Sequence, residues 1–321
     1  MNRYNNLYQK IISVENLKLA DVNARKGKSR QIGIKKHDKN KEENINHLHY
    51  LLKNKLYKTS PYITFTIFEP KERLIYRLPY SDRIVHHAIL NILEPIFVST
   101  FTTDTYSCIK GRGIHSASYK LKKTLFHNVK ATTFCLKIDI KKFYPSIKHY
   151  ILKTLLRRKF KDNDLLWLLD GIIDSSDGVP IGNYISQYLA NFYLSYFDHW
   201  IKEVQKALYY FRYADDMIFL SGCKKFLHKL LHNIKGYLWD NLKLVLKKTY
   251  QIFPVASRGI DFLGYVFFHG YTLIRKGIKK NFARMLKYSR NQPSIESYKG
   301  WFKHCNSVNL LNKLLYGTAT T

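Results

Sequence analysis

Apolar residues follow two periodicities along the chain, and the changes between them divide it into helical and extended segments. Recurrence every three or four positions predicts amphipathic helices. These helices are expected over residues 4–24, 45–56, 81–101, 186–201 and 226–239. Alternating or continuous β-prone runs between turn residues predict strands. The strands are expected over residues 62–70, 73–80, 132–140, 209–213, 217–220 and 261–265. Because helices and strands are interleaved, the pattern predicts an α+β fold.

The segment FRYADDMIFL, residues 211–220, predicts a hairpin with an acidic tip. Two β-prone runs flank the adjacent carboxylates of Asp215 and Asp216. Carboxylates walled in by apolar residues are costly to bury unless a cation neutralises them. The segment therefore indicates that Asp215 binds a divalent metal ion. From the hairpin alone, an ordinary solvent-facing Asp-Asp turn is an equal alternative.

A further carboxylate, Asp139, interrupts the β-prone run of residues 132–140. A buried central strand should be apolar at this position, and such a local violation of pattern usually marks a functional residue. If this strand lies beside the 209–220 hairpin, the carboxylates of Asp139 and Asp215 converge. Two metal ions held there could act on phosphate, one by activating a 3′-hydroxyl and the other by neutralising the triphosphate and the leaving group.

The charge balance of the chain points to nucleic acid. Lys and Arg together number 54 against 23 Asp and Glu, a formal net charge of +31, and the 321 residues include 25 Tyr, 19 Phe and 4 Trp. Positive charge interleaved with flat stacking surfaces is typical of nucleic-acid-binding proteins. General solubility is a weaker explanation, because acidic residues serve it better.

The four cysteines have no CxxC spacing, which argues against a disulfide framework and a zinc module. The N-terminus lacks the apolar core of a signal peptide, and no apolar run is long enough to span a bilayer. We therefore expect a soluble cytoplasmic protein with reduced thiols and no membrane partner.

Several basic segments are candidates for phosphate contact. The polar N-terminal region, residues 1–60, places a cluster of cations between two predicted helices, and a solvated linker is the alternative there. A second cluster lies among glycines that let the backbone approach a template strand. A third lies in residues 266–321, which carry ten Lys or Arg against one acid. The residues expected to contact nucleic acid are Arg25, Lys26, Lys28, Arg30, Lys110, Arg112, Lys279, Lys280 and Arg284.

The predicted hairpin of residues 62–80 carries Lys71 and Arg73 at or just after its turn. A flexible basic hairpin suits a triphosphate, because Lys supplies a point charge and Arg a planar fork for phosphate oxygens. An edge strand protected by charge is the alternative that these residues leave open.

Five segments together resemble a reverse transcriptase, in the family's order and at plausible spacing. They are the strand with Asp139, DGVPIGNYISQYLANFYLSYFD (177–198), YADD (213–216), LKLVLKKTY (242–250) and GIDFLGY (259–265). The resemblance implies a right-hand polymerase with fingers, a palm built on an antiparallel sheet with helices, and a small helical thumb. The shared order and spacing of all five segments argue against a chance match.

The resemblance also implies roles for individual residues. Asp139, Asp215 and Asp216 are the implied catalytic acids and metal-site residues, with Asp139 and Asp215 the direct ligands of two Mg²⁺ ions, or of Mn²⁺ in their place. Tyr144 is the implied gate beneath the sugar of the incoming dNTP. The implied triphosphate contacts are Lys71 and Arg73, and Lys248 is the candidate for assisting pyrophosphate departure.

The segment IGNYISQ, residues 181–187, resembles reverse transcriptases of diversity-generating retroelements, which are related to those of group II introns. Most reverse transcriptases have QGxxxSP here, whereas this chain has Ile181 in place of Gln and Gln187 in place of Pro. In that family the enzyme copies a template-repeat RNA with frequent errors opposite adenine, and the cDNA replaces a variable repeat, a process called mutagenic retrohoming. Ile181 cannot hydrogen-bond as Gln does, so it would check the nascent pair less stringently; the alternative is that it only fills a pocket. Gly182 would let the backbone lie close to the nucleotide.

The resemblance implies a division into four parts. These are a basic extension (1–60), fingers (61–113 and 148–182), palm (114–147 and 183–265) and thumb (266–321), without an RNase H or endonuclease domain. The implied partners are an RNA template, a cDNA primer, dNTPs and an oligomeric accessory variability protein. The alternatives are an antiphage, retron-like or free-standing group II-type reverse transcriptase, or a catalytically dead RNA-binding scaffold.

Overall fold

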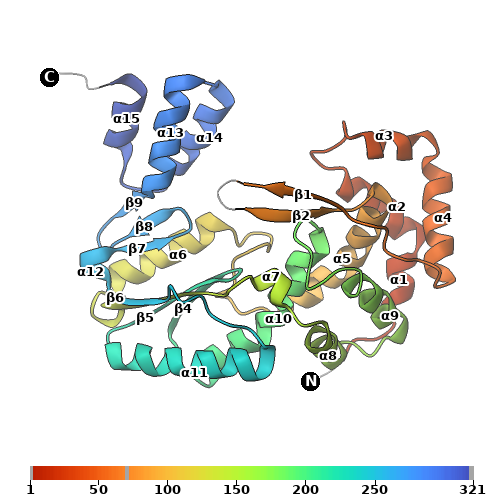
Figure 1. Cartoon of the computed structure of the whole chain (residues 1–321), viewed down its shortest axis with the longest axis horizontal. Coiled ribbons are helices and arrows are strands. Elements are labelled where there is room, and N and C mark those ends of the chain that lie inside the picture. The colour runs from red at the N-terminus through yellow and green to blue at the C-terminus, as the bar shows by residue number, and fades with distance from the viewer. Residues whose placement is uncertain (1–2, 69–71, 318–321) are drawn as a thin grey trace. The chain divides into compact units, whose positions relative to one another are not determined.

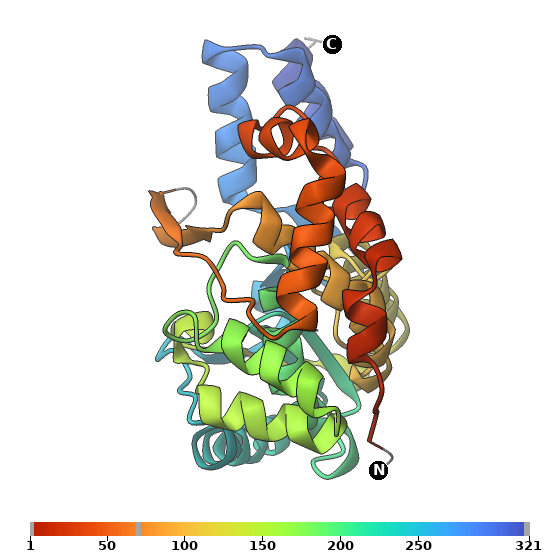
Figure 2. The same ribbon diagram turned by 90° about the vertical axis from the view of Figure 1, so that its right-hand side faces the viewer.

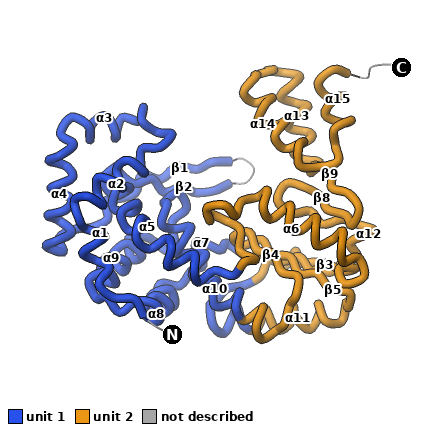
Figure 3. The backbone as a smooth tube through the Cα atoms, turned by 180° about the vertical axis from the view of Figure 1, so that it is seen from behind, with its two compact units in different colours: residues 1–102, 141–199, 237–245 blue, residues 103–140, 200–236, 246–321 orange. Residues whose placement is uncertain are grey.

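The computed structural model describes residues 3–68 and 72–317 and forms two compact units (Figures 1 and 3). The first unit contains residues 1–102, 141–199 and 237–245, and the second contains residues 103–140, 200–236 and 246–321. Each unit is therefore assembled from segments that are far apart in the sequence. The division into extension, fingers, palm and thumb uses other boundaries and stays a prediction.

The first unit is mainly helical and is organised around the long helix α5 (Tyr80–Thr100), whose apolar residues recur at helical spacing and are buried. Helix α2 packs along α5, and α8 lies beside α9 (Figure 2). The elements of this unit are α1 (Tyr8–Ile12), α2 (Val14–Ala24), α3 (Ile32–Lys39), α4 (Lys41–Lys53), β1 (Ile63–Ile67), β2 (Arg73–Arg77), α5, α7 (Phe143–Ser146), α8 (His149–Lys159), α9 (Asn163–Ile173) and most of α10 (Tyr184–Glu203).

The N-terminal helices differ from their predicted bounds. The helix predicted over residues 4–24 is two helices, because Ser13 ends α1 and its hydroxyl accepts a hydrogen bond from the Asn16 backbone N–H at 3.2 Å, which caps α2. The helix predicted over residues 45–56 begins earlier, at Lys41. Helix α3 lies inside the predicted loop, because Ile34 is buried there.

Helix α5 has no side-chain cap at its N-terminus, although Ser81 and Asp82 at the start of the predicted helix are residue types that favour capping. The helix begins at Tyr80, with Pro79 at the N-cap position. The carboxylate of Asp82 instead accepts hydrogen bonds from the Tyr57 hydroxyl at 2.7 Å and from a backbone N–H at 3.1 Å. Asp82 therefore ties α5 to the segment that precedes β1.

The predicted basic hairpin is confirmed as the antiparallel pair β1–β2, in which Ile63 lies opposite Arg77 and Ile67 opposite Arg73. Its turn, including Lys71, lies outside the described residues. The backbone N–H of Tyr76 donates a hydrogen bond of 2.8 Å to the carbonyl oxygen of Ile181, which lies in another segment of the first unit. This bond anchors the hairpin along β2.

The second unit contains a four-stranded antiparallel sheet in the order β4–β5–β3–β6. Its strands are β3 (Phe134–Asp139), β4 (Tyr209–Tyr213), β5 (Asp216–Ser221) and β6 (Gln251–Pro254). The hairpin predicted over residues 209–220 is confirmed as β4–β5. The strand that carries Asp139 pairs directly with β5, as the sequence analysis proposed.

One face of this sheet packs against α6 (Ile114–His127) and a second, three-stranded sheet in one hydrophobic cluster. The second sheet has the order β7 (Ile260–Phe262), β8 (Tyr265–Phe267) and β9 (Thr272–Ile274), and α12 (Val255–Arg258) leads into it. The strand predicted over residues 261–265 is a tight hairpin instead. Its turn contains Gly264 at φ 86°, where an added Cβ would meet Trp301 at 2.5 Å, so the turn requires glycine.

The C-terminal segment of the second unit is a small helical bundle, in agreement with the helical pattern predicted for residues 266–321. It consists of α13 (Lys276–Tyr288), α14 (Gln292–Phe302) and α15 (Val308–Tyr316). Phe282 and Phe302 are fully buried in its core. Helix α11 (Lys224–Leu242) has residues in both units.

The four cysteines are free thiols, as predicted. Among the helices in the described ranges, none is long and apolar enough to cross a membrane.

Candidate active site

Three carboxylates, those of Asp139, Asp215 and Asp216, come together where the two central strands of the four-stranded sheet, β3 and β5, have their adjacent ends. We name this place the acidic edge. Asp139 is the last residue of β3, and its Cα partner on β5 is Asp216, the first residue of that strand. Asp215 lies in the turn immediately before β5, after Ala214 at φ 54°. The antiparallel pairing therefore brings residues 76 positions apart in the sequence to one place, as the sequence analysis predicted for Asp139 and Asp215.

The same face of β3 is apolar at one end and acidic at the other. Side chains two residues apart on a strand share a face, so Cys135, Lys137 and Asp139 point the same way. Cys135 is fully buried in the hydrophobic cluster under α6, whereas the carboxyl of Asp139 is 30% exposed. The catalytic candidates therefore lie where the packed core ends and solvent begins.

The carboxylates carry charge that the protein compensates only in part. Burial raises the pKa of Asp215 to about 6, and the negative charge of Asp139 adds to this effect. Burial also raises the pKa of Asp216 to about 6, against the opposing effect of Lys137. Desolvation and neighbouring like charges both favour the protonated acid, and a bound cation would reverse that preference.

The donor set fits a divalent cation. Asp139 Oδ1 and Asp216 Oδ1 are buried without a hydrogen-bond partner, and carboxylate oxygens are the ligands that Mg²⁺ and Mn²⁺ prefer. In the described ranges, no group of three or more His, Cys, Asp or Glu side chains is already arranged around a common metal position. The fit therefore rests on these two unpartnered oxygens and on carboxylate chemistry.

Two lysines lie against the carboxylates. Lys247 Nζ is 2.6 Å from Asp139 Oδ2, and the Lys247 backbone N–H donates to the Asp139 carbonyl at 2.8 Å. Lys137 Nζ is 3.7 Å from Asp216 Oδ2. Lys248, the candidate for assisting pyrophosphate departure, is exposed beside Lys247. Lys137 could have been found from its two-residue spacing to Asp139.

Arg212 supports the turn that carries Asp215 and was missed by the sequence analysis. It is the largest fully buried side chain in the described structure. Its guanidinium donates to the Ala214 carbonyl at 3.1 Å and to Thr105 Oγ1 at 3.4 Å. Its backbone N–H donates to the Asp104 carbonyl at 2.9 Å. An arginine directly before YADD in an apolar strand was the available signal.

Apart from Lys248, which lies in the second unit, the candidate nucleotide residues belong to the first unit. Tyr144 lies in the short helix α7, and its carbonyl accepts a hydrogen bond from the Val179 N–H at 3.0 Å. The Ile181 carbonyl accepts the bond from Tyr76 on β2. Gly182 has φ 119°, and an added Cβ would meet the Tyr76 carbonyl oxygen at 2.5 Å, so only glycine fits. The structure therefore joins Ile181 and Gly182 to the hairpin that carries Arg73.

A cationic pocket of about 340 Å³ lies next to Gly182 in the first unit. Its basic lining residues are Lys26, Lys28, Arg77, Arg83, His86 and His87, and no acidic residue lines it. The ring of His87 stacks on Tyr184 with centroids 4.4 Å apart. His86 is almost fully buried, its Nε2 has no hydrogen-bond partner, and burial lowers its pKa to about 4. The pocket therefore offers positive charge, a flat ring and a neutral imidazole to a ligand.

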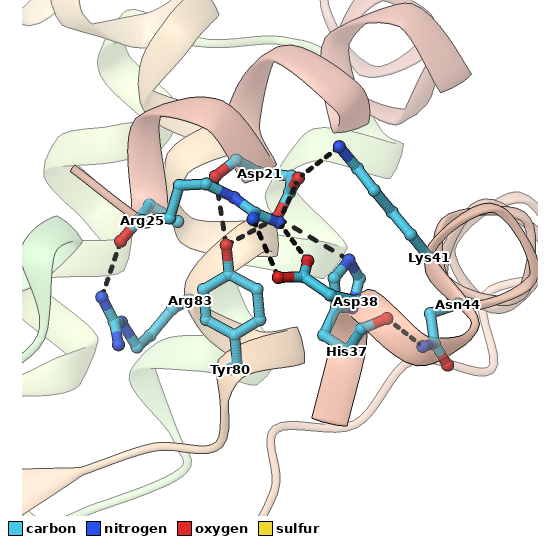
Figure 4. A network of polar contacts seen from close by, with 9 residues as sticks. Asp21, Arg25, His37, Asp38, Lys41, Asn44, Tyr80 and Arg83 are labelled. Atoms are coloured by element: carbon cyan, nitrogen blue, oxygen red, sulfur yellow. Dashed lines mark hydrogen bonds and ion pairs between the residues drawn. The ribbon is translucent and has the colours of Figure 1, made fainter. Parts of the chain in front are cut away.

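Arg25 holds the basic loop in place instead of lining this pocket (Figure 4). Its guanidinium lies 2.7 Å from the fully buried carboxylate of Asp21 and 2.8 Å from Asp38. The hydroxyl of Tyr80 donates to Asp21 at 2.5 Å, and Lys41 lies 3.2 Å from it. The predicted phosphate contact by Arg25 therefore competes with two ion pairs inside the protein.

The remaining nucleic-acid candidates are spread over both units. Lys26, Lys28 and Arg30 are exposed in the loop between α2 and α3. Lys110 is exposed and Arg112 partly buried, on either side of Gly111 at φ 77°. Lys279, Lys280 and Arg284 are exposed on α13, whose buried residue is Phe282.

Comparisons with known proteins agree with the geometry of the acidic edge. Residues 58–267 match the family model described as reverse transcriptase (RNA-dependent DNA polymerase). Protein YkfC of Escherichia coli (strain K12) is 29% identical over 240 residues, which cover 61% of this chain and 61% of YkfC. Group II intron-encoded protein LtrA of Lactococcus lactis subsp. cremoris is 21% identical over 259 residues, which cover 58% of this chain and 43% of LtrA.

Solved structures show the fold. Apo telomerase from Candida Tropicalis superposes with a TM-score of 0.54 at 11% identity, covering 80% of this chain and 56% of that chain. Telomerase from Candida albicans, in complex with a fragment of telomeric RNA, gives 0.52 at 10% identity, covering 77% and 55%. The fold is therefore the predicted α+β right-hand polymerase fold. The chain spans less than two thirds of the length of these relatives. Because the family match covers more than half of the chain, the protein belongs to the reverse transcriptase family.

Proposed function

We propose that the protein is an RNA-directed DNA polymerase that uses the acidic edge of the four-stranded sheet as its catalytic centre. The observation that carries the proposal is the pairing of Asp139 opposite Asp216, with Asp215 in the adjoining turn. Reverse transcriptase domains generally use divalent metal ions. Such chemistry requires carboxylates that remain available to a cation, and two oxygens at this edge are unpartnered.

Asp139 and Asp215 would hold two Mg²⁺ ions, or Mn²⁺, with Asp216 beside them. Bound there, the ions would neutralise phosphate charge and favour ionisation of the primer 3′-hydroxyl. The chain's own contribution is to fix the carboxylates. Lys247 is bound to Asp139 through both side chain and backbone. Arg212 fixes the carbonyl of the residue before Asp215.

The incoming dNTP would be held by residues of the first unit. Arg73, with Lys71 of the same hairpin, would contact the triphosphate. Tyr144 would lie beneath the sugar and exclude a 2′-hydroxyl, and Ile181 and Gly182 would lie near the base pair. Lys248 would assist pyrophosphate departure, although the contact of Lys247 with Asp139 makes that neighbouring lysine the stronger candidate.

The RNA template and cDNA primer would be bound through their backbones. Lys279, Lys280 and Arg284 form an exposed cationic face on α13, and Lys110 and Arg112 flank a glycine that lets the backbone approach a strand. Lys26, Lys28 and Arg30 would contact RNA from the basic loop. Contacts of this kind depend on salt and not on sequence.

The biological role that the residues favour is error-prone synthesis in a diversity-generating retroelement, with an accessory variability protein as partner. The supporting feature is Ile181 in place of the family's Gln. Its backbone is fixed to β2, so the side-chain substitution alters the chemistry of this position without freeing it. A group II-type enzyme is the second candidate, because LtrA, named a group II intron-encoded protein, aligns over 58% of the chain.

Primer extension tests the catalytic assignment. With an RNA template, a DNA primer, dNTPs and Mg²⁺, wild type is expected to make cDNA and Asp215→Ala to make at least about a hundredfold less. Asp261→Ala is the matched control, because Asp261 is an exposed carboxylate in the same unit. Equal extension by wild type and Asp215→Ala would show that the catalytic centre is elsewhere.

Sequencing of the cDNA tests the error-prone role. Ile181→Gln restores an amide that can hydrogen-bond near the nascent pair, so we expect fewer errors opposite template adenine, by about tenfold, with a smaller change in total synthesis. Ile181→Leu is the matched control and should keep the wild-type spectrum. The same adenine error spectrum for Ile181→Gln and wild type would remove the support for a diversity-generating role.

A further inference from the structure

An aromatic and basic surface of the second unit lies away from the acidic edge. A pocket of about 350 Å³ is formed by one face of α6, by the turn between β8 and β9, and by Asn306. Its aromatic and basic lining residues are Tyr119, Lys122, Lys123, Phe126, His127, Phe268, His269 and Tyr271. We name this set the α6 pocket. No acidic residue lines it.

The position of the α6 pocket separates it from the catalytic carboxylates. His269 Nε2 lies 3.2 Å from the hydroxyl of Thr132, just before β3 begins at Phe134. Asp139 is at the other end of that strand. A strand rises about 3.3 Å per residue, so roughly 16 Å of β3 separates the two places. A ligand in the α6 pocket therefore does not occupy the catalytic centre.

Three aromatic side chains that line this pocket are unusually exposed to solvent. Tyr119 is 69% exposed, Phe126 is 67% exposed and Tyr271 is 47% exposed, and all three line the same depression. Tyr119 and Phe126 are seven residues apart on α6, which places them on one face of the helix. Apolar rings gathered at one exposed place usually mark a binding surface.

The walls of the pocket are fixed before any ligand binds. Tyr271 stacks on Phe268 with centroids 4.6 Å apart, and the Phe268 N–H donates to the Tyr271 carbonyl at 2.9 Å. Asn306 accepts a hydrogen bond from the Thr272 N–H at 3.0 Å, which holds the β8–β9 turn from the other side. Ordered rings lose little entropy when a flat ligand stacks on them.

The cations select the class of ligand. Lys123 is exposed beside the rings, and in the described part of the chain no carboxylate forms an ion pair with it. Lys122 donates to the backbone carbonyl of His304, and burial lowers its pKa. Rings that stack bases next to cations that attract phosphates are the features that bind single-stranded nucleic acid. A duplex backbone would use the cations but not the exposed rings.

We propose that the α6 pocket binds unpaired nucleotides of RNA, at a site separate from the catalytic centre. The bases stack on Tyr119, Phe126 and Tyr271, and Lys123 contacts the phosphates. This second contact would hold a single-stranded segment of an RNA while another part of it is copied. The proposal does not depend on the class of retroelement.

A binding assay with fluorescein-labelled ten-nucleotide oligo(U) RNA tests the proposal. The double variant Tyr119→Ala/Phe126→Ala is expected to bind at least about fivefold more weakly than wild type, because loss of one stacked base has an effect of about 1 to 3 kcal/mol. Phe126→Trp keeps a ring and should retain affinity. Tyr150→Ala is the matched control, because Tyr150 is an exposed aromatic residue, 61% exposed, on α8 of the first unit.

Two further measurements separate the possible outcomes. Oligo(U) carrying 4-thiouridine should crosslink to α6 or to the β8–β9 turn, and a blunt ten-base-pair RNA duplex should compete poorly. Extension of a short primer–template should be unchanged in the double variant, so failure of this proposal is distinguishable from failure of the polymerase assignment. Unchanged oligo(U) affinity in the double variant would overturn the proposal and would indicate a protein-binding surface. Equal competition by the duplex would also overturn it.

Discussion

The acidic edge of the second unit and the cationic pocket of the first unit have charges of opposite sign, and burial shifts the pKa values of their titratable groups in opposite directions. At the acidic edge, burial raises the pKa values of Asp215 and Asp216 to about 6, so the folded protein favours neutral acids. In the cationic pocket, burial lowers the pKa values of His86 and His87 to about 4, so it favours neutral bases. Each place carries charge of one sign that the protein does not fully compensate. The difference indicates a cation as the ligand of one and a phosphate-bearing group as the ligand of the other.

The two places also differ in how they are supported. The acidic edge is fixed by strand pairing and by the buried guanidinium of Arg212. The loop of the cationic pocket is fixed by side chains, since Asp21 collects Arg25, Tyr80 and Lys41 around one carboxylate (Figure 4). A single substitution should therefore disturb the pocket's loop locally, whereas the edge is part of the core sheet.

Among residues outside the three carboxylates, the largest expected effect is at Arg212. Arg212→Met removes the hydrogen bond to the Ala214 carbonyl, so the turn carrying Asp215 loses its support. We expect kcat to fall about thirtyfold with little change in the KM for dNTP, because a small displacement of a catalytic group is costly while substrate contacts stay. Steady-state primer extension measures both constants. Arg212→Lys is the partial control, and a change confined to KM would contradict a positioning role.

The next largest effect is the loss of stability that His86 causes at acidic pH. Its ordinary pKa is about 6.5 and its folded pKa about 4, so below pH 6.5 the unfolded chain takes up a proton that the folded protein does not. This residue should therefore lower the free energy of unfolding by about 2 kcal/mol between pH 7.5 and pH 5. Urea unfolding of wild type and His86→Leu at both values measures it. If both proteins lose equal stability on acidification, His86 is not held neutral.

Asp216 at the acidic edge should affect stability with the opposite pH dependence. Because the folded pKa of Asp216 is raised, its contribution to stability is largest at low pH and is lost as pH rises through about 6. In metal-free buffer, Asp216→Asn should exceed wild type in free energy of unfolding by about 1 to 2 kcal/mol at pH 7.5, and by less at pH 5. The same urea titrations, run with a chelator, provide the measurement. A larger gain at pH 5 than at pH 7.5 would contradict the account of this edge.

The smallest expected effect is at Lys247. Lys247→Met removes the ammonium group 2.6 Å from Asp139 Oδ2 but keeps the backbone hydrogen bond. We therefore expect the extension rate to fall about threefold. Lys248→Met is the matched neighbour and tests the original candidate for assisting pyrophosphate departure. Should Lys248→Met be the slower of the two, the sequence-based choice would be right and the contact at Lys247 structural.

The sequence predicted the parts of the fold that depend on local pattern. Alternation around Asp215 and the break at Asp139 were sufficient to place two carboxylates together, because strand pairing follows simple periodicity. The roles of Lys247 and Lys248 could not be separated, since the chain here forms a single bridge, Ile140 with Leu246, and no regular strand. The ion pair of Arg25 with Asp38 could not be predicted from the sequence, because Asp38 comes from a helix inside a segment that the pattern described as a loop.

The central claim, that a divalent ion binds between Asp139 and Asp215, can be tested without measuring synthesis. Fe²⁺ can replace Mg²⁺ in a carboxylate site, and with ascorbate and peroxide it cleaves the nearby backbone. We predict cleavage close to residues 139 and 215 that excess Mg²⁺ suppresses and that Asp139→Asn/Asp215→Asn abolishes. Cleavage at other positions, or cleavage at these positions that the double variant retains, would contradict the account.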